Sequence, residues 1–249
     1  MNRVFGALPV VAFLAVAAGA TPALADDLGG GFTINGGATV VSDYRFRGIS
    51  QTDKNIAIQG TFTLSHSSGF YASVWGSSIS DYVANGSNNE IDLIAGYKKA
   101  YKSTTVDVGV LYYYYPGSGG ANTDFAEPYV KLTQAFGTAS LTGTLAYAPK
   151  QKALTVDGIH KEDNLYLAAD LAYPIAKTPF GLAAHIGHSY GPSYLTIGKG
   201  YTDWSVGGTF TRKALTVGLS YVDTNKSLYS PSGRNISKGG IVGSVGVAF

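Results

Sequence analysis

Residues 56–65 read IAIQGTFTLS and show the pattern that decides the fold. Apolar residues or glycine stand at the even positions, while the polar residues Gln59, Thr61 and Thr63 stand at odd positions. An alternation with a period of two places the two kinds of side chain on opposite faces of an extended strand. The segment therefore predicts a β-strand with one apolar face and one polar face.

The same period recurs from Phe32 to the end of the chain, in runs separated by segments rich in Gly, Ser, Asn, Lys and Pro. Counting such runs gives about twelve strands, and an even number is typical of a single-chain outer-membrane barrel. The expected strands span residues 32–48, 55–65, 70–80, 89–99, 104–115, 124–136, 138–148, 163–175, 180–190, 201–212, 215–224 and 240–249.

The links between these strands alternate in length. Residues 67–69 and Gly137 are short links, whereas residues 81–88 and 149–162 are long ones. Transmembrane barrels have this asymmetry, with short periplasmic turns and long extracellular loops. Because unpaired backbone groups are costly in hydrocarbon, strands can cross a membrane only when their sheet closes and leaves no edge. We therefore expect an all-β fold consisting of a single closed antiparallel transmembrane barrel.

Aromatic residues on the apolar faces gather near the strand ends. Such amphipathic rings form girdles at both interfaces of outer-membrane barrels, although aromatic residues also have a high strand propensity in any β-protein. The girdle beside the short links is expected to contain Tyr97, Phe136, Tyr173, Phe180 and Phe210. The girdle beside the long links is expected to contain Tyr44, Phe46, Tyr112, Tyr114, Tyr147, Trp204 and Tyr221.

The composition excludes several other classes. Charged residues make up 14% of the chain, against roughly 25% in soluble domains, and the formal net charge is +2. With 45% hydrophobic residues the chain is too apolar for a disordered protein, and its near-neutral charge argues against nucleic-acid binding. The chain has no cysteine, so it has no disulfide framework, thiolate chemistry or Cys-type zinc site. We expect no cofactor.

The N-terminus has the features of a secretory signal peptide. Arg3 precedes an apolar run over residues 4–20, and the small-residue site Ala23-Leu24-Ala25 follows. The alternative is an N-terminal transmembrane anchor. We expect cleavage near Ala25, which leaves residues 26–249 as the barrel.

The C-terminus ends in Ile241, Gly243, Val245, Val247 and Phe249 at alternate positions. A terminal strand that closes on an aromatic residue is similar to the signal that the barrel-assembly machinery is thought to read. We expect Phe249 to serve that machinery.

The parity of the first strand assigns side chains to the two faces of the wall. If the even positions, including Tyr44 and Phe46, face lipid, then Asp43, Arg45 and Arg47 point into the lumen near the extracellular mouth. Charges that line a pore set its ion preference, so the two arginines could select anions. The alternative is a structural ion pair that fixes the wall, or a loop folded into the barrel.

Further charges point inward by the same rule, and acids outnumber bases among them. This excess favours a mild preference for cations if no loop plugs the lumen. The chain has four histidines, and none forms a nucleophile arrangement with Ser and Asp, nor is there a G-x-S-x-G or H-E-x-x-H motif, so we expect no enzyme. The additional pore-lining candidates are Glu90, Asp92, Asp107, Lys131, Asp170, His185 and Asp203.

The N-terminal half of the chain resembles the TorF porin family. The resemblance rests on SDYRFRGISQT at residues 42–52, SGFYASVWGSSIS at 68–80, EIDLIAGY at 90–97 and DVGVLYYYYPG at 107–117. It implies an outer-membrane barrel with a porin-like role and identifies no solute.

Together these observations predict a passive pore for small hydrophilic solutes or ions in the outer membrane of a Gram-negative bacterium. Two alternatives stay open: a barrel with a plugged lumen and a structural or surface-interaction role, and a soluble secreted β-sandwich. The expected partners are outer-membrane lipid and lipopolysaccharide phosphates, which cationic loop residues could meet. Those residues are Lys150, Lys152, Lys161, Lys199, Lys226, Arg234 and Lys238.

Overall fold

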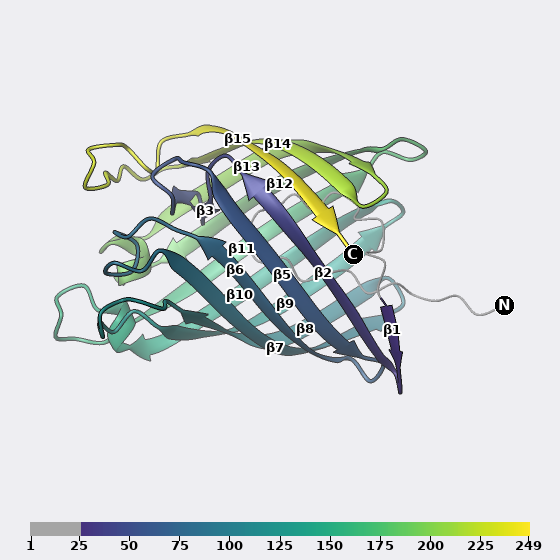
Figure 1. The fold of residues 1–249 in the computed structure, drawn as a ribbon, viewed down its shortest axis with the longest axis horizontal. Coiled ribbons are helices and arrows are strands. Elements are labelled where there is room, and N and C mark those ends of the chain that lie inside the picture. Colours follow the sequence, from purple (N-terminus) through teal and green to yellow (C-terminus); the bar gives the residue numbers. More distant parts are fainter. Residues whose placement is uncertain (1–25) are drawn as a thin grey trace.

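The computed structural model describes residues 26–249, which form one antiparallel sheet closed into a barrel of twelve strands (Figure 1). The predicted signal peptide, residues 1–25, lies outside the described residues. The wall consists of β2 (Phe32–Val41), β5 (Ala57–His66), β6 (Phe70–Ser78), β7 (Asn89–Tyr101), β8 (Thr104–Tyr114), β9 (Phe125–Phe136), β10 (Ala139–Gln151), β11 (Glu162–Pro174), β12 (Phe180–Tyr190), β13 (Tyr201–Arg212), β14 (Leu215–Thr224) and β15 (Gly240–Ala248).

Five small elements complete the described chain. They are the strands β1 (Asp26–Gly29), β3 (Arg45–Phe46) and β4 (Ile49–Ser50), and the 3₁₀ turns η1 (Lys152–Leu154) and η2 (Tyr194–Thr196). No helix within residues 26–249 is long and apolar enough to cross a membrane.

The ring closes where the last strand pairs with the first. Ser244 to Ala248 of β15 lie opposite Val41 to Gly37 of β2, and Phe249 exchanges two backbone hydrogen bonds with Gly36. Beyond that point β1 pairs with the remaining edge of β2. The seam therefore has backbone partners along its length, as a barrel in hydrocarbon requires.

The alternation seen in the sequence separates the outer surface from the interior. Along β8, Val108, Val110, Tyr112 and Tyr114 are exposed on the outside, whereas Asp107 is buried on the inside. Exposed apolar side chains occur in every strand of the wall, and a surface of this kind suits acyl chains rather than water. The predicted closed barrel of twelve strands is confirmed, and the soluble sandwich is wrong because the single sheet closes on itself.

The two ends of the barrel differ as the link lengths predict. Tight turns such as Gly137-Thr138, where Gly137 has φ 64°, gather at the end that also holds the C-terminus (Figure 1). We call this the short-turn end. The longer loops, among them residues 42–56, 79–88 and 225–239, lie at the opposite, long-loop end.

The first predicted strand is the main error in the sequence-based assignment. Strand β2 ends at Val41 rather than at residue 48, because the chain there leaves the wall and turns into the barrel. Tyr44 is buried and Phe46 half-buried in the interior, so their predicted place in the lipid-facing girdle is wrong. The other predicted strand ends fall within a few residues of those observed.

Candidate functional site

A loop folded into the lumen is the central feature of the interior. Val41 and Ala57 lie opposite each other in the β2–β5 register, and residues 42–56 between them enter the barrel at the long-loop end. We call these residues the inner loop. Within it, β3 and β4 form a small hairpin in which Arg45 pairs with Ser50 and Phe46 pairs with Ile49.

The tip of this hairpin explains the Arg-Gly pair in the sequence. Arg47 and Gly48 have φ values of 47° and 80°, and two left-handed residues are what a two-residue type I′ turn requires. A Cβ atom on Gly48 would collide with Thr224 and with the Cβ of Asp203, at 2.9 Å from the latter. Glycine is therefore required at this tip both by backbone conformation and by space.

Arg47 carries the hairpin tip across the lumen to the opposite wall. Its Nη2 donates to Glu127 Oε1 at 2.5 Å, and its Nη1 donates to Asn164 Oδ1 at 2.7 Å. The guanidinium carbon lies 4.1 Å from the ring centroid of Tyr166 and 4.8 Å from that of Phe46. Arg47 is thus completely enclosed and joins the inner loop to β9 and β11.

Asp43 and Arg45 pair with each other rather than with a passing solute. Arg45 Nε donates to Asp43 Oδ2 at 2.7 Å, and its Nη1 donates to the carbonyl oxygen of Lys238 at 3.1 Å. The other oxygen of Asp43 accepts from Ser50 Oγ at 2.5 Å. Both groups are buried, and their contacts stabilise the inner loop internally and against the last long loop.

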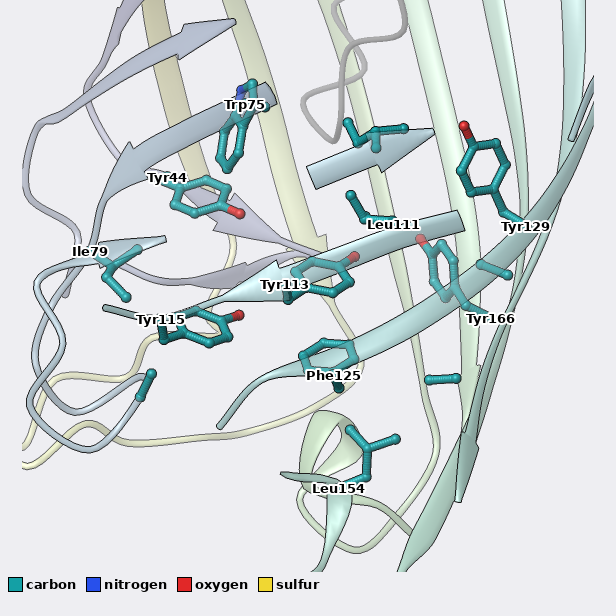
Figure 2. Close-up of a cluster of buried hydrophobic side chains, with 14 of the residues drawn as sticks. Tyr44, Trp75, Ile79, Leu111, Tyr113, Tyr115, Phe125, Tyr129, Leu154 and Tyr166 are labelled. Atoms are coloured by element: carbon teal, nitrogen blue, oxygen red, sulfur yellow. The ribbon is translucent and has the colours of Figure 1, made fainter. Parts of the chain in front are cut away.

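An aromatic cluster packs around the inner loop and extends along the lumen towards the short-turn end (Figure 2). Tyr44 donates its hydroxyl proton to Glu90 Oε1 at 2.8 Å, and its ring lies 5.4 Å from that of Trp75. Tyr113 stacks on Phe125 with their centroids 4.2 Å apart. Trp75, Tyr113 and Phe125 come from the wall strands β6, β8 and β9, so the inner loop lies in a packed, aromatic part of the lumen.

The other long loops hold the inner loop from above. Tyr82 donates its hydroxyl proton to the carbonyl oxygen of Ser50 at 2.8 Å, and Ser50 N–H donates to that of Ile236 at 2.9 Å. At the rim, Asp53 accepts hydrogen bonds from Ser230 Oγ at 2.7 Å and from Ser232 Oγ at 2.8 Å. Loops 79–88 and 225–239 therefore act together as a cover over the outer half.

Buried acids lie beside the inner loop. Glu90, Asp92 and Glu127 are each at most 2% exposed, and among residues 26–249 only Arg47 forms an ion pair with any of them. Glu127 also accepts from Tyr113 at 3.2 Å, whereas Asp92 Oδ1 has no hydrogen-bond partner among the described residues.

The inner half of the lumen, towards the short-turn end, carries charges of both signs, some of them partly exposed. Asp107 accepts from the Tyr71 hydroxyl at 2.7 Å and pairs with Lys98 Nζ at 3.3 Å. Lys131 lies on the neighbouring strand, with its Nζ 5.0 Å from the ring centroid of Tyr129. The Lys98 side chain is 25% exposed, and Lys131 is half-buried.

On the opposite arc of the wall, His185 lies between two carboxylates. Its Nδ1 is 2.7 Å from Asp170 Oδ1 and its Nε2 is 2.9 Å from Asp203 Oδ1. The hydroxyl of Tyr166 donates to Asp203 at 3.1 Å. Because both ring nitrogens already face a carboxylate, this arrangement positions the imidazole structurally and leaves no nitrogen free for a substrate.

The structure places all ten pore-lining candidates on the interior side of the wall or in the inner loop, and their role in transport stays a prediction. Three belong to the inner loop and two to the buried acids. Four more, Asp107, Lys131, Asp170 and His185, lie further along the wall towards the short-turn end, and Asp203 lies against the hairpin tip. Sequence reasoning missed Glu127 and Asn164, which fix Arg47. Glu127 has the same parity as Lys131, so the alternation could have identified it. That Glu127 and Asn164 are the partners of Arg47 could not be predicted, because no regular spacing in the sequence connects these positions.

Comparisons with solved structures find outer-membrane proteins at low similarity. An outer membrane channel from Pseudomonas putida F1 shares 12% identity at a TM-score of 0.47, covering 88% of this chain and 94% of its own. An anion-selective porin from Comamonas acidovorans shares 11% identity at a TM-score of 0.43, covering 87% of this chain and 98% of its own. The outer membrane protein opdK from Pseudomonas aeruginosa shares 12% identity at a TM-score of 0.47, covering 90% and 68%. Similarity at this level defines no function.

A search of curated protein sequences finds no significant match. A family profile, in contrast, matches residues 25–242, which is nearly the whole of the described barrel. The chain belongs to the Gcw_chp family, described as bacterial proteins of unknown function.

Proposed function

We propose that the protein is an outer-membrane porin of a Gram-negative bacterium, a passive diffusion channel for small hydrophilic solutes or ions. In this proposal the inner loop forms the constriction. The location is supported by the closed sheet and by its exposed apolar surface, which suit a bilayer. The resemblance to the TorF porin family in residues 42–117 agrees with the proposal.

The observation that carries the proposal is the charged inner half of the lumen. Lys98 and Asp170 have side chains that are 25% exposed, and Lys131 beside them is half-buried. In barrels of eight strands, side chains fill the interior, whereas barrels of sixteen or more strands leave a wide channel. A barrel of twelve strands lies between these two cases. Accessible charges in such a barrel suit the passage of water and ions.

The inner loop divides this lumen into two parts. Its contacts with Glu127, Asn164 and the covering loops close much of the outer half. We expect this arrangement to give a low conductance, and displacement of the hairpin to give a higher one. The charges of Asp43, Arg45 and Arg47 then affect selectivity mainly through the shape of the constriction, because each is already paired.

A barrel with a plugged lumen is the second candidate. It is favoured by one specific observation: Arg47 is enclosed and hydrogen-bonded on two wall strands, which is costly to undo. In that case the long loops would serve surface interactions, and their cationic residues would meet lipopolysaccharide phosphates.

Planar-bilayer conductance of two proteins distinguishes these functions. The first is the wild type, and the second replaces residues 42–56 by Asn-Gly, which suits a type I′ turn between the paired residues Val41 and Ala57. Low conductance that rises in the variant supports the porin. A silent wild type with a conducting variant supports the plugged barrel. If neither conducts, the porin is contradicted and the inner loop is not what closes the lumen.

A matched control shortens a long loop that makes local contacts. Residues 156–159 suit this purpose, since Asp157 bonds to Thr155, Ile159 and His160 within the same loop. This variant should conduct as the wild type does. Heat-modifiable gel mobility shows that each protein is folded.

A further inference from the structure

Acidic and basic side chains alternate around the lumen wall from β7 to β13, in a row that we call the charge ladder. Each strand of this range gives one residue to the ladder, except β10, which has threonines at the corresponding positions; Glu90, Asp92 and Glu127 lie nearer the long-loop end and are not part of it. In strand order the residues are Lys98, Asp107, Lys131, Asp170, His185 and Asp203.

The charged side chains of the ladder form ion pairs on both sides of β10. At β10 itself the row of charges is interrupted. On one side Asp107 uses both of its oxygens, one for Lys98 at 3.3 Å and one for the Tyr71 hydroxyl at 2.7 Å. On the other side His185 is held between Asp170 and Asp203. The break therefore lies between Lys131 and Asp170.

Lys131 and Asp170, the two residues at the break, can each form further hydrogen bonds or ion pairs. Within residues 26–249, Lys131 Nζ makes no hydrogen bond or ion pair, and it lies 5.0 Å from the ring centroid of Tyr129. Asp170 engages one oxygen with His185, and its second oxygen has no hydrogen-bond partner in the same part of the chain. The Asp170 side chain is 25% exposed, so this oxygen can be reached from the lumen.

The register fixes the spacing of the two charges. Thr142 of β10 lies opposite both Thr133 and Asp170, and Thr144 lies opposite Lys131. Strands in a sheet lie about 4.8 Å apart, so β9 and β11 are separated by about 10 Å. On its other side Lys131 lies directly opposite Asp107 of β8, whose two oxygens are already engaged by Lys98 and Tyr71. The gap is lined by hydroxyl groups, with Thr133 and Thr142 hydrogen-bonded at 2.8 Å.

We propose that this break is a binding site for small zwitterions, namely amino acids or short peptides. Lys131 binds the carboxylate, Asp170 binds the ammonium group, and the threonine hydroxyls face the segment between them. A simple anion meets the carboxylate of Asp170 and a simple cation meets Lys131, whereas a zwitterion satisfies both ends. This inference rests on the proposed porin, because it names the class of solute that enters the lumen.

The test measures binding in detergent micelles, where conduction plays no part. Glycylglycine is the zwitterionic probe, and N-acetylglycinamide is a neutral analogue of similar size. Saturation-transfer NMR titrations compare the wild type with Lys131→Gln and Asp170→Asn. Lys102→Gln, in an exposed turn, is the control. Gel mobility after heating confirms that each variant is folded.

We expect glycylglycine to bind the wild type and the control equally, and to bind each of the other two variants roughly tenfold more weakly, since a charge-assisted hydrogen bond is lost. N-acetylglycinamide should bind all four proteins weakly and alike. The exchange variant Lys131→Asp with Asp170→Lys should recover part of the binding. Equal binding of the two probes, or unchanged binding in both single variants, overturns the proposal.

The outcome separates the site from the porin function. Selective glycylglycine binding by a protein that never conducts supports the site and contradicts the porin. Conduction without such selectivity contradicts the site alone.

Discussion

Arg47 Nη2 and Glu127 Oε1 lie 2.5 Å apart and join the tip of the inner hairpin to strand β9 on the opposite wall. The pair is enclosed on both sides, so neither charge can be hydrated if the other is removed. Removing one partner of a buried pair typically costs about 3–5 kcal/mol. This ion pair therefore contributes strongly to holding the inner loop in the position that closes the outer half of the lumen.

Arg47→Gln should release the inner hairpin from the wall while the barrel stays closed, because the wall strands pair without it. We expect an increase in single-channel conductance and faster proteolysis within residues 42–56. Arg45→Gln is the comparison, since Arg45 binds within the inner loop and to Lys238 and never reaches the far wall. A similar conductance increase in both variants would contradict the special role of the Arg47–Glu127 pair.

Gly48→Ala should destabilise the same hairpin by another route. The substitution imposes a side chain at φ 80° and drives its Cβ into Thr224, so a cost of about 1–3 kcal/mol is expected. The control is Gly143→Ala, in strand β10, where an added Cβ meets nothing within 4 Å. Thermal unfolding followed by gel mobility should show a loss for the first variant and little change for the second.

The rim contact of Asp53 should weaken in acid. Burial opposes ionisation, but hydrogen bonds from Ser230 and Ser232 and the charge of Arg234 lower the pKa of the Asp53 carboxyl below its ordinary value. A lowered pKa means that the ionised form is favoured in the folded loops. The stabilisation is therefore complete above the ordinary Asp pKa of about 3.9 and disappears as the pH falls through the lowered value.

Hydrogen exchange of residues 228–236, corrected for intrinsic rates, checks this expectation. Protection should stay constant from about pH 8 to pH 5 and decrease only below the ordinary Asp pKa. Asp53→Asn should show reduced protection throughout that range, by less than about 1 kcal/mol for so accessible a contact. A loss of protection near pH 6 in the wild type would point to another group.

Much of the barrel could be predicted because its cause is local. A lipid-facing surface and a polar interior impose a period of two on every strand. This alternation is visible within short stretches such as residues 104–115 and 201–212. The inner loop breaks this rule. Asp43, Tyr44 and Arg45 continue to look like a strand, yet all three are buried in the interior. Their partners, such as Glu90 and Lys238, lie far along the chain, so no local pattern indicates them.

The turn at Arg47-Gly48 was the one local signal of that departure. A glycine after a polar residue favours a type I′ hairpin tip, which is incompatible with a straight strand over residues 32–48. The charge ladder could be predicted only in part. Parity places its members inside and puts threonines on β10, but which charges pair, such as Lys98 with Asp107, depends on three-dimensional packing.

The last residue of the chain offers a prediction that separates assembly from stability. Phe249 and Gly36 exchange backbone hydrogen bonds of 2.9 and 2.8 Å, and the Phe249 ring packs against Gly36, 2.8 Å from where a Cβ of Gly36 would be. Phe249→Ala keeps the backbone bonds and loses the ring, whereas deletion of Phe249 loses both. If the assembly machinery reads the ring, Phe249→Ala should refold normally in detergent but accumulate poorly in the outer membrane. Deletion should impair both, because the seam between β15 and β2 then loses its terminal pair. Equal accumulation of wild type and Phe249→Ala in cells would show that the ring contributes only to packing at the seam.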